Sequence, residues 1–599
     1  MKSSQSGSQS RFSRRRFVQG LAAASLPASL AWHSAWGRVA GGAHQPLLNG
    51  PQIDLEIHPL PFNVSGRPRI ATAVNGSMPG PILRVTEGDT VTIRVRNALP
   101  VSSSIHWHGL RLPNPMDGVP GLTYRGIASA ETFTYRFPIR QSGTYWYHSH
   151  SGMQEQTGLS GPLVLVPRDP EPYHYDRDYV VMLTDWSDTD PMTILSNLKQ
   201  QSDYYDYRRR ILAQFFTDAH RNGLRATLHD RLMWDRMRMS PSDIMDVTGS
   251  TYTFLLNGTP PAANWTGLFR PGEKIRLRVI NGSSMTTFDV RIPGLPLTVV
   301  AADGSDVEPV TVDEFRIGVA ETYDLIVEPP RAAAYTIFAQ AEDRSGYARG
   351  TLAPHSGMTA KIPPMDPRPV RTMLDMGMAM GTGTHRDSMS TSGMPNMPDM
   401  PDMPDMPAMT MVASGRDPAD TKANNADGVD PATLRGSRFV ASVSRAPHDR
   451  LQEPGDGLEN NGRRVLVYTN LKSLHAVLGM PRPTRDVVFH LTGNMQRFVW
   501  GFDGETFSHS APIRVRLGER VRFILINDTM MEHPMHLHGF LFALENGQGA
   551  RMPLKHTVNV KPSGLVKFQF TADTPGYWAF HCHLLYHMEA GMFRTVLIS

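Results

Sequence analysis

The sequence predicts an all-β protein made of three similar β-sandwich domains, with a partly helical insert and one long linker. Two observations support this fold class. Short runs in which Val, Ile, Arg and Thr alternate are separated by Gly and Pro turns along most of the 599 residues, and this pattern is typical of antiparallel sandwiches. A set of turn and strand signals also recurs three times, which indicates a repeated domain.

The repeated unit starts with an Asn-Gly or Asp-Gly turn and continues to a Gly-acidic step before an alternating strand. In each copy an asparagine follows the second glycine by nine residues. The turns are Asn75-Gly76, Asn257-Gly258 and Asp503-Gly504, the steps are Gly88-Asp89, Gly272-Glu273 and Gly518-Glu519, and the asparagines are Asn97, Asn281 and Asn527. We therefore assign residues 43–172, 173–355 and 461–599 to three domains of one fold.

The outer copies carry histidines where the middle copy is apolar. The relevant positions lie 18 and 20 residues after the second glycine. They hold His106 and His108 in the first copy, His536 and His538 in the third, and Val290 and Ile292 in the middle copy. We expect a metal site built by the first and third domains, and a middle domain without ligands.

Residues 1–42 are predicted to be an export signal. Arg14, Arg15 and Arg16 precede an apolar, alanine-rich run that extends to about Trp32, and no acidic residue occurs before Asp54. A basic segment followed by a short apolar one is typical of secretory signals, and the paired arginines indicate the twin-arginine export machinery. The alternative is a basic amphipathic arm. We predict a periplasmic protein without a membrane span, because the apolar run is too short to cross a bilayer.

The basic net charge comes from this segment. The formal net charge is +4, and the first 40 residues contain six basic residues and no acidic one. The rest of the chain therefore carries a net charge of −2. A nearly neutral protein gives no reason to expect nucleic acid as a partner.

Two segments depart from the strand pattern. Residues 190–245 are predicted to be partly helical and to decorate the second domain. Residues 356–460 are rich in Met, Pro, Asp, Gly and Ser, a composition that cannot build a core, so we predict an exposed, flexible linker between the second and third domains.

Methionine recurs every third residue within this linker, mostly as Met-Pro-Asp. Thioethers normally fill cores, and a soft sulfur suits Cu(I). The hypothesis is that the tract collects Cu(I) and delivers it to a copper site, and the alternative is a low-complexity spacer. The repeated residues are Met394, Met397, Met400, Met403, Met406 and Met409.

Cys582 is the only cysteine in the chain, so it cannot form an intrachain disulfide. It stands between His581 and His583, with His587 five residues and Met592 ten residues further on. A free cysteine is most often a small buried apolar residue, and a cysteine beside histidine also suits a nucleophile. Flanking histidines do not suit an apolar core, because a buried imidazole needs a partner or a metal. A thiolate, imidazoles and a distant thioether are the ligands of a blue-copper site.

Strand geometry divides these side chains between two sites. Residues two apart on a strand point to the same face, so an extended segment directs His581 and His583 to one side and Cys582 to the other. His533 lies three residues before His536, on the opposite face, where it can meet Cys582. Three further His-x-His pairs, with imidazoles about 7 Å apart at the usual strand rise, are His106/His108, His148/His150 and His536/His538. Eight imidazoles fit a cluster of several copper ions.

The segments that contain these residues resemble, in order, the copper motifs of multicopper oxidases. They are His-Trp-His-Gly, Tyr-Trp-Tyr-His-Ser-His, His-Pro-Met-His-Leu-His-Gly and His-Cys-His-Leu-Leu-Tyr-His-Met-Glu-Ala-Gly-Met. The resemblance covers nearly all of the chain from about residue 50 and implies cupredoxin-like Greek-key β-barrels with four copper ions. It implies one type 1 ion held by His533, Cys582, His587 and Met592, one type 2 ion held by His106 and His536, and two type 3 ions held by His108, His148, His150, His538, His581 and His583.

Within this family the sequence looks most like the periplasmic copper-resistance oxidases (CopA type). That resemblance implies oxidation of Cu(I) to Cu(II), with four-electron reduction of dioxygen to water, and other copper-resistance proteins as partners. The residues expected to be catalytic are Cys582, Asp117 and Glu589. Asp117 matches an acid that the family places near the cluster, although a turn aspartate before Gly118 is the alternative, and the offset of Glu589 differs from that of some relatives.

Two other functions share the same ligands. A laccase-like oxidase of phenols or aromatic amines would differ only in its substrate site, which the sequence does not reveal. A copper-sequestering protein would rely on the methionine tract, with turnover incidental. A copper nitrite reductase is disfavoured, because three domains and eight cluster histidines point to dioxygen.

Overall fold

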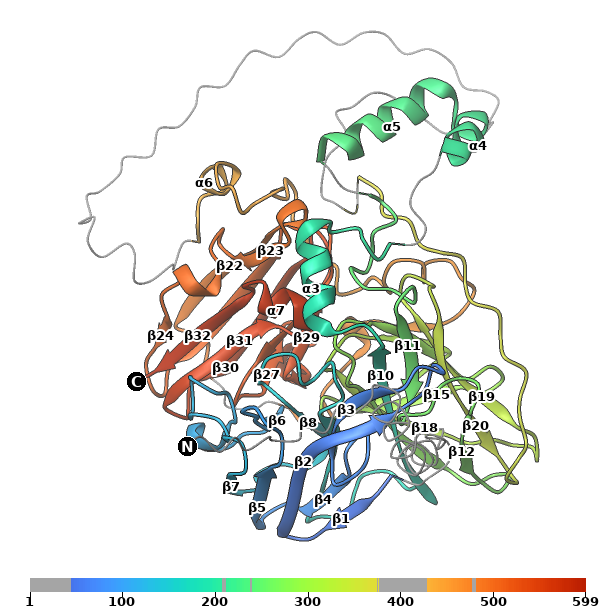
Figure 1. Cartoon of the computed structure of the whole chain (residues 1–599), viewed down its shortest axis with the longest axis vertical. Helices are drawn as coiled ribbons and strands as arrows, with labels where there is room; N and C mark the ends of the chain where they lie inside the picture. Colours follow the sequence, from blue (N-terminus) through green and yellow to red (C-terminus); the bar gives the residue numbers. More distant parts are fainter. Residues whose placement is uncertain (1–44, 207–211, 238–239, 374, 376–427, 477–480) are drawn as a thin grey trace, which may run out of the picture.

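The computed structural model of the chain describes residues 45–206, 212–237, 240–373, 375, 428–476 and 481–599. Six β-sheets pair into three sandwiches, so the predicted all-β class is confirmed (Figure 1). The predicted export signal and the whole methionine repeat, Met394 to Met409, lie outside the described residues.

The first sandwich combines a sheet of order β1-β4-β9-β8-β6 with one of order β3-β2-β5-β7. Its strands are β1 (Leu47–Asn49), β2 (Gln52–Phe62), β3 (Arg69–Val74), β4 (Ile82–Thr86), β5 (Thr90–Asn97), β6 (His106–His108), β7 (Thr132–Pro138), β8 (Gly143–His148) and β9 (Ser160–Val166).

The second sandwich combines sheets of order β11-β10-β13-β18-β15-β16 and β12-β20-β19-β14-β17-β21. Its strands are β10 (Arg177–Ser187), β11 (Tyr252–Leu256), β12 (Trp265–Leu268), β13 (Ile275–Asn281), β14 (Phe288–Arg291), β15 (Leu297–Ala302), β16 (Ser305–Val312), β17 (Glu314–Ile317), β18 (Thr322–Val327), β19 (Tyr335–Ala341), β20 (Tyr347–Ala353) and β21 (Val465–Leu466).

The third sandwich combines sheets of order β23-β22-β25-β30-β27-β28 and β24-β32-β31-β26-β29. Its strands are β22 (Arg485–Asn494), β23 (Val499–Phe502), β24 (Ile513–Val515), β25 (Arg520–Asn527), β26 (His533–Leu537), β27 (Phe542–Leu544), β28 (Leu554–Lys555), β29 (Thr557–Val560), β30 (Leu565–Thr571), β31 (Gly576–Cys582) and β32 (Phe593–Ile598).

The helices are few and lie outside the sandwiches. The predicted helical insert contains α3 (Pro191–Gln200), α4 (Leu212–Asn222) and α5 (Leu224–Met237), and α4 and α5 project from the body of the molecule (Figure 1). Asp190 caps α3, accepting from Thr193 N. The remaining helices are α6 (Pro431–Arg435), α7 (Leu585–Glu589) and the 3₁₀ helices η1 (Asn114–Met116), η2 (Tyr468–Asn470), η3 (Met495–Arg497), η4 (Phe507–His509) and η5 (Gly549–Arg551). No described helix combines the length and the apolar character that a membrane span needs.

The repeated asparagine performs the same task in each sandwich. Asn97, Asn281 and Asn527 end β5, β13 and β25 and are completely buried. Each side-chain amide donates to a carbonyl group in the loop that follows it and to another farther along the chain, as when Asn527 Nδ2 bonds the carbonyls of Met531 and Val560. A buried loop needs such partners for its backbone. The asparagine therefore fixes the segment that leads into β6, β14 or β26.

The expectation of purely antiparallel sheets is wrong, because every domain contains more than one parallel pair, and one of these joins two early strands. Strands β2 and β5, β10 and β13, and β22 and β25 run parallel, whereas most other pairs are antiparallel. Alternation in the sequence reports which face a side chain occupies, not the direction of the neighbouring strand. A parallel pair needs a long crossover, and the Greek-key connection of each domain supplies it.

The predicted exposed linker is folded at both of its described ends. Arg371 and Met373 are buried, and the guanidinium of Arg371 pairs with Asp456 at 2.8 Å. Strand β21, which we had assigned to the third domain, extends the sheet of the second through β17. A prediction from composition alone places charged residues at the surface, but charged residues that pair with each other can be buried.

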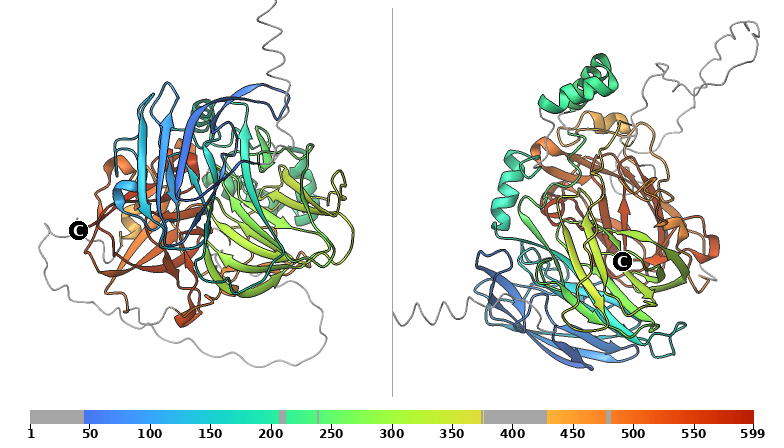
Figure 2. Two further views of the ribbon diagram at one scale, coloured as in Figure 1. Left: turned by 90° about the horizontal axis from the view of Figure 1, so that it is seen from below. Right: turned by 90° about the vertical axis from the view of Figure 1, so that its right-hand side faces the viewer.

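The three sandwiches meet one another (Figure 2). Arg111 bonds Asp573 between the first and third domains at 2.6 Å, Thr144 bonds Asp324 between the first and second at 3.0 Å, and Arg316 bonds Glu532 between the second and third at 3.2 Å. The ligand-bearing strands β6, β8, β26 and β31 belong to the sheets that contribute to this junction.

Candidate metal centre

Strand pairing brings the four His-x-His motifs together in two groups. In the first domain, β6 pairs with β8 so that His106 lies opposite His148. In the third domain, β26 pairs with β31 so that His536 lies opposite His581. Because side chains opposite each other on neighbouring strands share a face, each domain presents four imidazoles to the interface.

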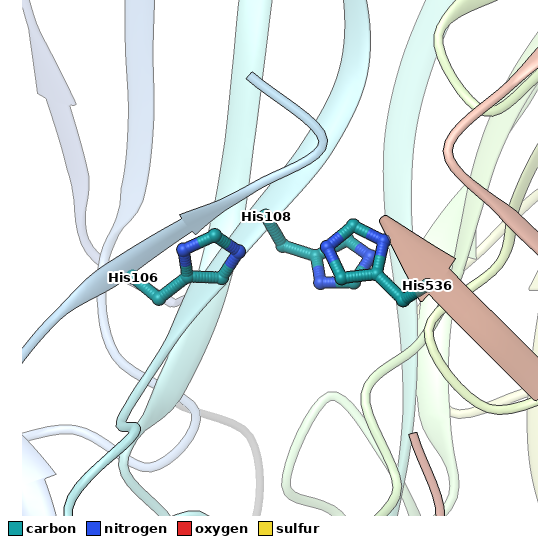
Figure 3. A group of neighbouring side chains, drawn as sticks. All are labelled: His106, His108 and His536. Atoms are coloured by element: carbon teal, nitrogen blue, oxygen red, sulfur yellow. The ribbon is translucent and has the colours of Figure 1, made fainter. Parts of the chain in front are cut away.

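The eight imidazoles form one buried cluster across that interface. His106 and His538, from different domains, stack with ring centroids 3.9 Å apart, and His108 and His536 stack at 3.8 Å. Figure 3 shows His106 and His108 on β6 converging with His536 on β26. Seven of the eight residues are buried, and His150 is half-buried.

Two groups of three rings and one pair can be distinguished within the cluster, although the two closest stacks, His106 on His538 and His108 on His536, join rings of different groups. His108, His148 and His583 have ring centroids 4.9 to 5.5 Å apart. His150, His538 and His581 have centroids 5.0 to 5.2 Å apart. His106 and His536 remain, with centroids 5.8 Å apart.

The hydrogen bonds leave nitrogen lone pairs that face each other. His538 Nδ1 lies 2.9 Å from Asp117 Oδ2, and His581 Nδ1 donates to the Cys582 carbonyl at 2.9 Å. Both rings are then protonated at Nδ1, so their Nε2 atoms, 3.0 Å apart, face each other as bare acceptors. Further buried ring nitrogens without a partner among the described residues are His106 Nε2, His108 Nδ1, His150 Nε2, His536 Nε2 and His583 Nδ1. Converging acceptors without a proton fit a set of metal ions.

Burial favours the neutral form of seven of these histidines, which is the form that binds metals. It lowers the pKa of His581 to about 4, and it lowers the pKa of His108 and His538 well below the usual value, with further lowering by neighbouring histidines. The same direction and main cause hold for the pKa of His148, His150, His536 and His583.

A second group lies on the other face of β26 and β31. Cys582 Sγ is 3.5 Å from His533 Nδ1 and 3.8 Å from His587 Nδ1. His533 Nε2 lies 2.7 Å from Thr529 Oγ1, and His587 Nε2 lies 2.6 Å from Asp246 Oδ2. Donation through these Nε2 atoms leaves both Nδ1 atoms, 3.2 Å apart, as acceptors beside the sulfur. Burial raises the pKa of the Cys582 thiol well above its usual value, so a cation is needed to hold it as the thiolate.

Met592 lies beside this group through its backbone. Its N–H donates to the His587 carbonyl at 3.0 Å, and its carbonyl accepts from Cys582 N–H at 3.1 Å. Met592 is fully buried in the same apolar core as Cys582. The short helix α7 carries His587, and the residues that follow it place Met592 beside Cys582.

The two predicted acids occupy different environments. Asp117 is completely buried between both domains: its carbonyl accepts from His106 Nδ1 at 2.7 Å, and its carboxylate contacts His538. Glu589 is exposed, and no hydrogen bond in the described structure joins it to a cluster histidine. Desolvation by the surrounding protein raises the pKa of Glu589, and Lys199 opposes that shift.

Glu589 faces a cavity of about 660 Å³ between the first and third domains. The same cavity reaches His150, the one cluster histidine that is not fully buried, and Phe498 near His587. It is lined mainly by apolar residues, including Val119, Leu122 and Phe593. A small molecule can therefore approach the histidine cluster from this side.

The sequence analysis missed several residues that contact the candidate ligands or support them. Four of them are ionisable: Glu155, whose carboxylate lies 2.7 Å from His148 Nδ1, Asp246, His556, and Asp303, which accepts from the backbone of residues 556 and 557. Burial raises the pKa of Glu155 well above its usual value, with a contribution from Asp185. Glu155 was detectable as an acid seven residues after His148, but the other three lie in loops without a motif.

Family models for multicopper oxidases match residues 57–170, 177–360 and 481–599. The chain belongs to the multicopper oxidase family, which identifies it as an oxidoreductase with copper as its cofactor.

Among characterised relatives, copper resistance protein A of Pseudomonas syringae pv. tomato is 50% identical over 608 residues, covering 99% of this chain and 100% of the relative. Copper resistance protein A of Escherichia coli is 50% identical over 603 residues, covering 98% and 99%. Among solved structures, Fet3p, a multicopper oxidase that functions in iron import, matches with a TM-score of 0.59 at 19% identity, covering 92% of this chain and 90% of Fet3p. The structural likeness supports the cupredoxin-like fold.

Proposed function

We propose that the protein oxidises Cu(I) to Cu(II) in the periplasm, reduces dioxygen to water with four electrons, and thereby serves copper tolerance. The observation that carries the proposal is the partition at β31, where Cys582 faces a two-histidine site and its neighbours face an eight-histidine cluster. The high identity to two copper resistance proteins supports Cu(I) as the substrate. The twin-arginine segment supports the location, and export machinery and other copper-resistance proteins would be the partners.

The ligand geometry supports a four-copper assignment. We assign the type 1 ion to His533, Cys582, His587 and Met592, the type 2 ion to His106 and His536, and the type 3 pair to His108, His148, His150, His538, His581 and His583. The pair and the two sets of three rings described above correspond to the type 2 ion and the two type 3 ions. Copper, when bound, supplies centres that change oxidation state by one electron each and together hold the electrons that dioxygen takes.

The residues of the chain perform the remaining tasks. Soft sulfur at Cys582 and Met592 favours the cuprous state, and imidazole serves both states. Cys582 is joined covalently to His581 and His583, which provides a short route for electrons between the two sites. The imidazole of His587, one ligand of the type 1 site, is held in place by Asp246, which contacts its Nε2, and by Trp500, which stacks on it at 3.9 Å. Asp117 orients two cluster histidines and is positioned to hold a proton near them.

Oxygen consumption by the purified protein tests the choice of substrate. We expect faster oxygen consumption with Cu(I) than with a phenol at equal concentration. The soft sulfur atoms of the methionine tract and the carboxylate of Glu589 at the cavity suit a cation. A faster reaction with the phenol would favour the laccase-like alternative. Stoichiometric Cu(I) binding without catalytic oxygen consumption would favour sequestration.

Deleting residues 376–411 tests the role of the methionine tract. We expect the variant to lose the Cu(I) ions that the tract binds and to oxidise dilute Cu(I) more slowly, with an unchanged visible band. The deletion starts after Met373, because that residue is buried in the core. Equilibrium dialysis with Cu(I) and initial rates over a range of Cu(I) concentrations provide the measurements. Unchanged stoichiometry and unchanged rates would reject the role and leave a spacer.

A further inference from the structure

His556 is a completely buried histidine that the copper assignment does not use. It precedes β29 in the third domain, and its ring lies against His108 of the first domain, with centroids 4.7 Å apart and the planes nearly perpendicular. Its Nδ1 lies 3.2 Å from His108 Nε2. His108 and His556 are 448 residues apart in the chain.

This contact couples the tautomers of His108 and His556. If His556 Nδ1 donates, His108 carries its proton on Nδ1, and if His108 Nε2 donates, His556 carries its proton on Nε2; neither of those two nitrogens has a partner in the described structure. The second pattern suits a metal ligand, since His108 Nε2–H then donates to His556 Nδ1, with Thr557 Oγ1 at 3.3 Å as a second acceptor. The Nδ1 lone pair of His108 is then free for the cluster.

The backbone of the same residue determines the tautomer of a second ligand. His536 Nδ1 donates to the carbonyl of His556 at 2.8 Å. The free nitrogen of His536 is therefore Nε2, which has no partner. His108 and His536, which stack at 3.8 Å, thus present opposite nitrogens to the cluster.

The middle domain holds His556 in place. Asp303 Oδ2 accepts from His556 N–H at 3.2 Å and from Thr557 N–H at 3.1 Å. Lys555 Nζ, also fully buried, lies 3.1 Å from both Asp303 and Glu321. Removing one partner from such a buried charge network strongly destabilises the folded protein. The segment 555–557 is therefore a rigid support shared by the second and third domains.

A role for His556 as a ninth ligand does not fit the geometry. Its Nδ1 is occupied by His108 and Thr557, which lies 3.1 Å away. Its Nε2 has no hydrogen-bond partner in the described structure, but it faces Gly109, where an added Cβ would lie only 2.8 Å from that nitrogen, and not the other histidines. Neither ring nitrogen is thus available to the cluster.

We propose that His556 is a positioning residue that fixes opposite tautomers of His108 and His536 and so prepares the type 3 and type 2 parts of the cluster for copper. The proposal rests on the ligand assignment made above. Groups that orient metal-binding histidines typically change metal affinity by about 10- to 100-fold when removed.

Three substitutions of His556 separate the effect of losing the ring contact from the effect of changing the side-chain volume. Asparagine keeps an acceptor near the place of Nδ1, glutamine keeps the bulk but moves its amide toward the place of Nε2, and alanine removes both. We expect His556→Ala and His556→Gln to lose copper about 10- to 100-fold more readily to a chelator. Both should also lose the near-ultraviolet absorption of the coupled copper pair. We expect His556→Asn to retain both properties.

The visible band of the type 1 site reports folding of the third domain and should persist in all three variants. His490→Ala is the matched control, since His490 is also buried in that domain and bonded to Asp528 at 2.6 Å, away from the cluster. If the His556→Ala variant does not fold, the comparison of the His556→Gln and His556→Asn variants tests the proposal. Glutamine and asparagine variants that both retain wild-type copper and absorption would overturn the inference. A wild-type protein without the near-ultraviolet absorption would instead overturn the copper assignment.

Discussion

Replacing Cys582 with serine is expected to abolish the visible sulfur-to-copper absorption and to reduce Cu(I)-dependent oxygen consumption to background. Cys582 is the only cysteine in the chain, and its Sγ lies 3.5 Å from His533 Nδ1 and 3.8 Å from His587 Nδ1. A serine hydroxyl has nearly the same volume but does not ionise to a soft anion, so the type 1 site loses its defining ligand. Absorption spectroscopy, copper analysis and an oxygen electrode provide the measurements.

The serine variant should retain the copper of the histidine cluster, because that cluster occupies the opposite face of β31. Copper content is therefore expected to fall by about one ion per chain, in keeping with the one metal held by this kind of site. Met495→Leu is a control, since it changes a buried residue of the same domain with little change in volume. A variant that keeps the visible band would show that Cys582 does not bind copper.

Replacing Asp117 with alanine is expected to keep the visible band but to slow reoxidation of the reduced protein by dioxygen about 10²- to 10⁴-fold, the usual range for loss of a positioned acid or base. Asp117 is fully buried and contacts His106 and His538, which come from different domains. Stopped-flow mixing separates the steps: anaerobic bleaching by Cu(I) reports reduction, and recovery of colour with dioxygen reports reoxidation.

Asp117→Asn distinguishes proton transfer from orientation of the histidines. The asparagine keeps an oxygen that can accept from His538 Nδ1 but cannot hold an acidic proton. We expect it to bind copper like the wild type and to reoxidise slowly, whereas the alanine variant should also bind cluster copper less tightly. Reoxidation of both variants at the wild-type rate would reject a role for Asp117.

The fold class and the division of ligands between two faces were predictable because both depend on local regularities. Alternation with a period of two separates Cys582 from His581 and His583 whatever the rest of the chain does. The repeat likewise reveals that Val290 and Ile292 replace histidines, and the structure buries both in the core of the second domain.

The supporting contacts could not be predicted, because they depend on how the domains dock. Asp246 reaches His587 across 341 residues, and His556 reaches His108 across 448. Neither pair is part of a motif, and a single sequence does not show which loops will face each other. The packed ends of the linker were missed for a related reason: the partner of Arg371 is Asp456, 85 residues away.

The positions of the proposed ligands along the chain imply an order of maturation. His533, Cys582, His587 and Met592 fall within 60 residues of one another, in a single domain. The eight cluster histidines instead extend from residue 106 to residue 583 and are contributed equally by the first and last sandwiches. A nascent chain that lacks the third domain can present only half of the imidazoles. Complete metallation therefore has to wait until synthesis has finished and the two terminal sandwiches have closed on each other.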